Sequence, residues 1–233
     1  MKISKMLLLV SCLSLSFNYA CAQDINTLVQ KAKTKIEGVN NYEASGKMKT
    51  NVAFLKVPVA TVKVYFKKPN RLKVKSEKGI SFIPKGAVSI NLNNIIGEGK
   101  FTVIDAGTDK VGGTLVRVAK MLPVDDNNDV VLSTLYIDEV TALIKKAKTT
   151  TRDNGTYELE MTYGKYAAYS LPDKIIFSFN TKDYKLPKGI TFDFDDGSAP
   201  AKPADIKKNK KGRAEITFSN YIINKGVSDL IFQ

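Results

Sequence analysis

The sequence predicts a mainly β protein with few α-helices, built on a single antiparallel sheet. Segments that alternate apolar and polar residues recur between residues 61 and 218, and a period of two is typical of a half-buried strand. Turn signals such as Pro69-Asn70 and Asn154-Gly155 separate these segments, as in strands that follow one another in hairpins. One long segment shows the helical period, so the sheet has little helical cover.

That helical segment comes early in the chain. Its apolar residues recur at steps of three and four, with lysines on the opposite side, and it ends at Gly38 and Asn40-Asn41. The apolar stripe consists of Ile25, Leu28, Val29, Ala32, Ile36 and Val39. We expect this stripe to pack on another element. A second, shorter helix is favoured over a strand at residues 86–99.

The expected strands present large aliphatic or aromatic residues to one common side. They lie at residues 61–66, 72–75, 101–104, 114–122, 130–137, 142–151, 157–163, 175–179, 190–194 and 216–218. The polar stretch from Asp196 to Arg213 is predicted to be a long solvated hairpin loop. Such a sheet can close and fill its interior with side chains, or curl around a helix and leave an apolar cavity. The pattern alone favours the filled interior.

The first 22 residues have the layout of a secretory signal. Lys2 and Lys5 precede an apolar run at residues 6–17, and Ala20-Cys21-Ala22 supplies small residues for cleavage. The run is shorter than the about 20 residues that a membrane helix needs. Cleavage is predicted between Ala22 and Gln23, which leaves residues 23–233 as one domain. Acylation of Cys21 is the alternative, although Asn18 and Tyr19 suit it poorly.

Composition excludes much catalytic chemistry. Both cysteines, Cys12 and Cys21, lie in the leader, and the chain has no histidine. The domain therefore has no disulfide, no cysteine or histidine nucleophile, no Ser-His-Asp triad and no histidine zinc site. The acidic runs 125–129 and 193–196 are interpreted as a turn and a solvated strand end, rather than a calcium site or a glycosidase pair. We expect no enzyme activity, no metal and no cofactor.

The charge of the domain is strongly basic. Without the leader, the domain has 34 Lys and Arg and 23 Asp and Glu, which gives a net charge of +11. This balance suggests anionic membranes, lipid head groups or polyanions as neighbours, or a charge that only keeps the protein dispersed. The cations are mostly lysines, which weakens any case for specific phosphate or base recognition. Nucleic acid is not an expected partner of an exported chain.

Several stretches, in this order along the chain, resemble the periplasmic lipoprotein-carrier superfamily of LolA and LolB. The amphipathic helix comes first. Residues 64–72 (VYFKKPNRL) are similar to the family's strand, basic pair, Pro-Asn and next strand. Residues 135–144 (LYIDEVTALI) are similar to its strand–Asp–turn–strand hairpin, and 216–221 (ITFSNY) with 229–232 (DLIF) to its last strand and terminal Phe.

The resemblance implies an unclosed β-barrel, a single curled antiparallel sheet that encloses helices over a concave apolar face. It favours a cavity for acyl chains over an interior filled by side chains. The expected lining is Val62, Val64, Phe66, Leu72, Val74, Tyr157, Leu159, Met161, Ile175, Phe177, Phe192 and Phe218. Lys68 stands where the family's carriers have an arginine that helps to hold the helical lid. Residues 79–107 diverge from the family's aromatic-rich pattern.

The function expected from the resemblance is a periplasmic carrier or binding protein for acyl chains of lipoproteins or lipids. It would move them towards the outer membrane without catalysis, as a monomer, between an inner-membrane donor and an outer-membrane acceptor protein. The alternative is a LolA-like sensing or interaction domain that contacts an envelope protein through its convex face or lysine-rich loop. An envelope hydrolase that works through Asp or Glu is a third, weaker hypothesis.

Overall fold

The computed structural model describes residues 24–52, 55–56, 59–78, 100–125, 128–152, 155–180 and 211–233. The predictions for the leader, the 86–99 helix, the 190–194 strand with Phe192, and the acidic run 193–196 lie outside the described residues. So does most of the predicted polar loop. Its predicted end at Arg213 is wrong, because the last strand already begins at Lys211.

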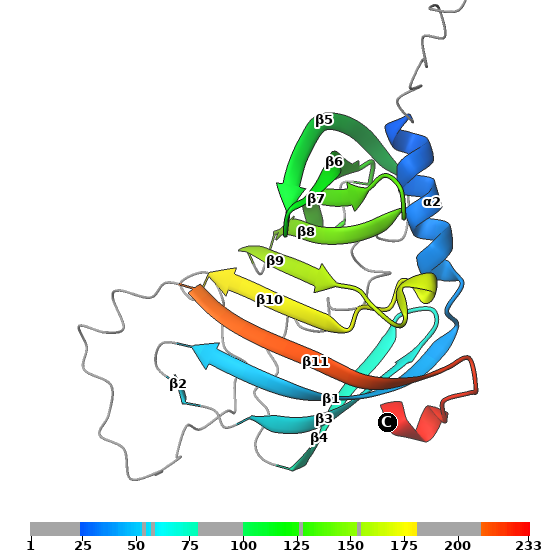
Figure 1. Cartoon of the computed structure of the whole chain (residues 1–233), viewed down its shortest axis with the longest axis vertical. Coiled ribbons are helices and arrows are strands. Elements are labelled where there is room, and N and C mark those ends of the chain that lie inside the picture. The colour runs from blue at the N-terminus through cyan, green and yellow to red at the C-terminus, as the bar shows by residue number, and fades with distance from the viewer. Residues whose placement is uncertain are drawn as a thin grey trace, which may run out of the picture.

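The described strands form one antiparallel sheet, which is curled but not closed (Figure 1). Its path is β4-β3-β1-β11-β10-β9-β8-β7-β6-β5, with β2 paired to β1 beside it. The edges of the described sheet are therefore β4 and β5, and the unclosed barrel is confirmed. The bounds are β1 (Asn41–Val52), β2 (Leu55–Lys56), β3 (Ala60–Lys67), β4 (Arg71–Lys78), β5 (Phe101–Val111), β6 (Thr114–Pro123), β7 (Val130–Asp138), β8 (Leu143–Thr151), β9 (Gly155–Thr162), β10 (Lys174–Asn180) and β11 (Lys211–Ile223).

Strand β1 was not predicted, although it lies centrally between β3 and β11. Its buried residues are Ala44, Gly46, Met48 and Thr50. Ala44 and Gly46 are small and have weak strand preference, and lysines lie at the outward positions. The alternation is present, but no large apolar residue marks it in the sequence between Tyr42 and Met48.

A β-bulge between β1 and β11 sets which side chains point inward. The pairing runs from Ser45 opposite Asn220 to Gly46 opposite Phe218, which leaves Ser219 as the extra residue. This extra residue places both Phe218 and Tyr221 on the buried side. The backbones approach closely here, since a Cβ atom on Gly46 would lie 2.5 Å from the Thr217 carbonyl oxygen. Glycine is therefore required at this position.

Helix α2 (Ile25–Glu37) confirms the predicted amphipathic helix. The Asp24 side chain caps its start by accepting a hydrogen bond from the Thr27 N–H at 3.1 Å. The predicted stripe is buried, and the helix packs against β5, β6, β7 and η2 (Ala167–Tyr169). In Figure 1 it runs along the ends of the green strands. No helix of the described segments has the length and apolarity needed to cross a bilayer.

A second 3-10 helix, η3 (Asp229–Phe232), ends the chain and packs against β4. It lies on the other side of the sheet from α2, because its partners Lys67 and Arg71 are cross-strand neighbours outside the buried rows. The sheet thus has a concave side with α2 and a convex side with η3.

Candidate ligand-binding face

The concave side of the sheet is apolar from strand to strand. One row crosses five strands and joins Phe177, Leu159, Ala147, Leu135 and Ala119 through consecutive cross-strand pairs. All five side chains are buried. Large and small residues alternate from Leu159 to Ala119, so neighbouring side chains interdigitate along this part of the row.

The next row carries a pair of buried hydroxyl groups. It runs from Phe179 through Tyr157, Thr149 and Ser133 to Met121. The Ser133 and Thr149 hydroxyls lie 3.0 Å apart and hydrogen-bond each other inside the protein. Each therefore satisfies the other, as buried polar groups require.

The half of the face formed by β3 and β4 is less completely covered. Val62, Val64 and Phe66 on β3 are buried, whereas Leu72 and Val74 on the edge strand β4 are half-buried. Val64 pairs with Val74, and Phe66 pairs with Leu72. An apolar rim is thus accessible at this edge.

Aromatic rings gather where β1, β3 and β11 meet. The Tyr42 ring lies 5.3 Å from that of Phe66 and 5.5 Å from that of Tyr221, and Tyr221 also contacts Phe218 at 5.0 Å and Tyr166 at 4.9 Å. Burial raises the pKa of Tyr42 and of Tyr221 above the ordinary range. Both phenols therefore stay neutral, and the cluster is amphipathic without being charged.

The sequence prediction missed Tyr42 and Tyr166, and it used Tyr221 only as part of a motif. Tyr42 lies in the unpredicted strand β1, and Tyr166 lies just before η2 rather than in a strand. The one sequence signal for them was an aromatic residue next to a strand boundary, which is too common to be informative.

The predicted lining residues fall on the concave side. Eleven of them are described, and they belong to one buried cluster or pack against it, together with the stripe of α2. The members of the cluster from the prediction are Val62, Val64, Phe66, Tyr157, Leu159, Met161, Ile175, Phe177 and Phe218, with Leu72 and Val74 packed against them. Their contact with a ligand stays a prediction, and Phe192 lies outside the described residues.

Few polar contacts fasten α2 to the sheet. The Lys68 ammonium donates to the Glu37 carbonyl oxygen in the last turn of the helix. The Lys35 Nζ donates to the Thr141 carbonyl oxygen at 2.8 Å, and the Asn224 Nδ2 donates to the Gly38 carbonyl oxygen at 3.3 Å. Lys68 thus contacts the helix at the position where a lid contact was expected. Apolar packing of the stripe is the main attachment.

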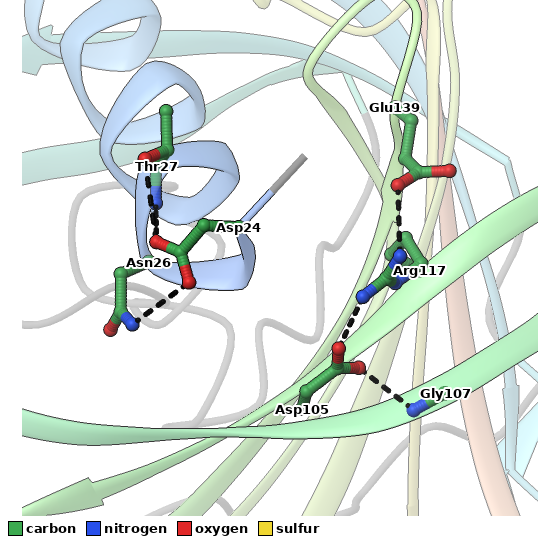
Figure 2. A network of polar contacts seen from close by, with 7 residues as sticks. All are labelled: Asp24, Asn26, Thr27, Asp105, Gly107, Arg117 and Glu139. Atoms are coloured by element: carbon green, nitrogen blue, oxygen red, sulfur yellow. Dashed lines mark hydrogen bonds and ion pairs between the residues drawn. The ribbon is translucent and has the colours of Figure 1, made fainter. Parts of the chain in front are cut away.

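A charged group interrupts the apolar face near the β5 edge (Figure 2). Arg117, only 14% exposed, pairs with Asp105 and, at 3.3 Å, with Glu139. A hydrogen bond from the Gly107 N–H and the Arg117 guanidinium lower the pKa of Asp105. Arg117 is the inward residue of its strand, opposite Ile137. The sequence signal for this group is an arginine at an apolar position of the alternation.

The described residues give no metal cluster of three or more His, Cys, Asp or Glu side chains. At the acidic run 125–129, of which the structure describes Asp125, Asn128 and Asp129, the Asn128 N–H donates to the Asp125 carbonyl oxygen at 3.2 Å. The turn itself stays a prediction, because residues 126 and 127 lie outside the described residues.

Comparison with known proteins identifies the fold. No protein-family model and no curated protein matches the chain. A solved outer membrane lipoprotein-sorting protein domain from Vibrio parahaemolyticus is similar, with a TM-score of 0.56, 12% identity, and coverage of 88% of this chain and 94% of that one. A LolA superfamily protein from Nitrosomonas europaea has a TM-score of 0.55 and 10% identity, with 89% and 96% covered.

A DUF1329 family protein from Desulfovibrio piger is also similar, with a TM-score of 0.52, 13% identity, and coverage of 90% of this chain and 97% of that one. The likeness extends over nearly the whole length of each protein, and at these identities it concerns the fold. The chain therefore has a LolA-like lipoprotein-carrier fold, which confirms the resemblance seen in its sequence.

Proposed function

We propose that this chain is a periplasmic carrier that binds acyl chains of lipoproteins or lipids on the concave face and moves them towards the outer membrane without catalysis. Residues 1–22 would be the leader and residues 23–233 the carrier domain. The observation that carries the proposal is the apolar face continuous from β4 to β6, with a single α-helix over part of it among the described residues. The LolA-like fold supports it.

The energetics of the interior suit a carrier. A chain of about 16 carbons, at about 0.8 kcal/mol per buried methylene, needs on the order of 10 kcal/mol of apolar contact to leave a bilayer. The larger stripe residues of α2, Ile25, Leu28, Val29 and Ile36, contribute roughly 1.5–3 kcal/mol each when buried. The two sums are of the same size. An acyl chain taken from water can therefore replace the helix on the sheet at little net cost, whereas uptake from a bilayer requires that the displaced stripe find other apolar contact.

Helix α2 would act as the lid in this exchange. Its link to β1 contains Gly38 and Asn40, and Lys68 holds the end of the helix through the Glu37 carbonyl oxygen. A lysine is a point donor, whereas an arginine fork can hold several carbonyl oxygens at once. We therefore expect a lid that opens more readily than one held by arginine.

The experiment is binding of a fluorescently labelled 16-carbon fatty acid to the purified domain. Leu72→Gln with Val74→Gln makes the accessible rim polar at half-buried positions, where the fold is least affected. We expect affinity to fall about tenfold, as for loss of about 1.4 kcal/mol of apolar contact, with unchanged melting temperature. The control is Ile104→Gln on the convex side, where the residue is 48% exposed. Equal affinity of the rim variant and the control would overturn the proposal.

The state of the N-terminus is part of the proposal and has its own measurement. The intact mass of the exported protein should correspond to a chain that begins at Gln23. A lipid-modified Cys21 would show instead a tethered acceptor.

A further inference from the structure

The convex side of β1, β3 and β4 carries a basic strip of seven cations. They occupy the outward positions of the three strands, and cross-strand pairing places Lys67 opposite Arg71 and Lys63 opposite Lys75. The strip consists of Lys47, Lys49, Lys63, Lys67, Arg71, Lys73 and Lys75. Like charges directly opposite each other destabilise a sheet. Anionic groups near the strip would therefore stabilise it.

At one end of the strip the chain supplies those counter-charges itself. The Asp229 carboxylate of η3 lies 2.8 Å from the Lys67 Nζ and 2.5 Å from an Arg71 nitrogen. The Lys73 Nζ donates to an oxygen of the last residue, Gln233, at 2.6 Å. The C-terminal turn thus offsets part of the positive charge at this end of the strip.

The other end is not neutralised by described residues. Lys63 pairs with Glu43 at 3.2 Å, and Lys75 lies over the Tyr65 ring at 5.9 Å. Within the described ranges no carboxylate forms an ion pair with Lys47, Lys49 or Lys75. These three lysines are exposed. The net positive charge of the strip is therefore concentrated on them.

The far half of the same convex side is different. Lys146 lies opposite Glu160 and Lys148 lies opposite Glu158, and the Lys146 Nζ is 3.0 Å from a Glu158 carboxylate oxygen. On β11, Glu215 lies directly opposite Lys49 of the strip, but its carboxylate is 2.8 Å from the Lys174 Nζ and 3.2 Å from an Arg213 nitrogen. Lysines and carboxylates thus lie opposite each other on β8 and β9, whereas the strip gathers cations on neighbouring strands, so the strip is a local feature and not only a consequence of net charge.

We propose that the basic strip, centred on Lys47, Lys49 and Lys75, docks the protein on a bilayer surface that contains anionic phospholipid. Strands are about 4.8 Å apart and outward residues about 7 Å apart along each strand, so the charges form a broad array. Such an array of lysines suits a diffuse negative surface, whereas recognition of one phosphate or carboxylate favours arginine forks. The inference deepens the proposed function, because a carrier loads and unloads at membranes.

The test is cosedimentation of the mature chain with phosphatidylcholine vesicles, with and without phosphatidylglycerol. Each lysine near an anionic surface strengthens binding about fivefold. The variant Lys47→Glu/Lys49→Glu/Lys75→Glu should therefore bind the anionic vesicles at least about a hundredfold more weakly, because it reverses three charges, with unchanged melting temperature. Added salt should weaken binding of the unmodified protein.

The matched control is Lys110→Glu/Lys120→Glu/Lys148→Glu, which has the same net charge and changes exposed lysines away from the strip. It should bind nearly as the unmodified protein does. Equal loss in both variants, or no preference of the unmodified protein for anionic vesicles, would overturn the proposal. The strip variant should keep its affinity for the labelled fatty acid in solution. Vesicle binding without fatty-acid binding in the unmodified protein would count against the proposed function alone.

Discussion

Leu28 of α2 offers a prediction in which a destabilised protein binds its ligand more tightly. Leu28 belongs to the lid helix and is fully buried against the sheet. The substitution Leu→Ala at such sites costs about 3 kcal/mol of stability. If the helix and the acyl chain compete for the same face, this loss falls on the closed state and raises the fraction of molecules that can bind. At about 1.4 kcal/mol per factor of ten, Leu28→Ala should tighten fatty-acid binding by up to about a hundredfold.

The assay combines thermal unfolding with titration of the labelled fatty acid. Leu135→Ala is the matched control, because Leu135 is equally buried but belongs to the sheet itself. It should lower the melting temperature similarly and leave the affinity equal or weaker. The reasoning would be refuted if Leu28→Ala weakened binding, or if both variants changed the affinity in the same direction and by the same amount.

Three further predictions concern the bulge, the lid contact and the C-terminal turn. Gly46→Ala should destabilise the protein by about 1–3 kcal/mol in urea unfolding, because its methyl group would meet the Thr217 carbonyl oxygen at 2.5 Å. Lys68→Met should speed fatty-acid uptake in stopped-flow measurements, whereas Lys68→Arg should slow it, because only the arginine keeps and extends the hold on the helix end. The hydrogen bonds from Lys67 and Arg71 lower the pKa of Asp229 from its ordinary value of 3.8. The stability that this pairing gives is therefore present above pH 3.8 and lost as the pH falls below it, which hydrogen exchange of the η3 amides would detect.

The fold could be predicted from the sequence wherever the strands carry large residues. Alternation such as that of Tyr157, Leu159 and Met161 identifies the buried side of a strand directly. The helical period likewise identifies all the buried residues of α2. Strand β1 escaped because Ala44 and Gly46 pack through their small size. Their role depends on the bulge and on the neighbour β11, which lies far away in the sequence.

The candidate site could be predicted only in part, for a related reason. The alternation identified which side chains face inward, but it could not show where the charged residues of that side would meet. Arg117, Asp105 and Glu139 come from different strands or turns. The register of β5 with β6 brings Asp105 to Arg117, and that of β6 with β7 brings Glu139. The basic strip is likewise a product of pairing, since each of its strands alone is an ordinary solvated alternation.

The central claim is that the concave face holds an acyl chain, and native mass spectrometry tests it most directly. The protein would be exported with its own leader and released from the envelope without detergent. The account predicts a species heavier by one or two acyl chains or by a lipoprotein, and loss of that species in the Leu72→Gln/Val74→Gln variant. A bare chain in every preparation would contradict it and support a sheet filled by its own side chains.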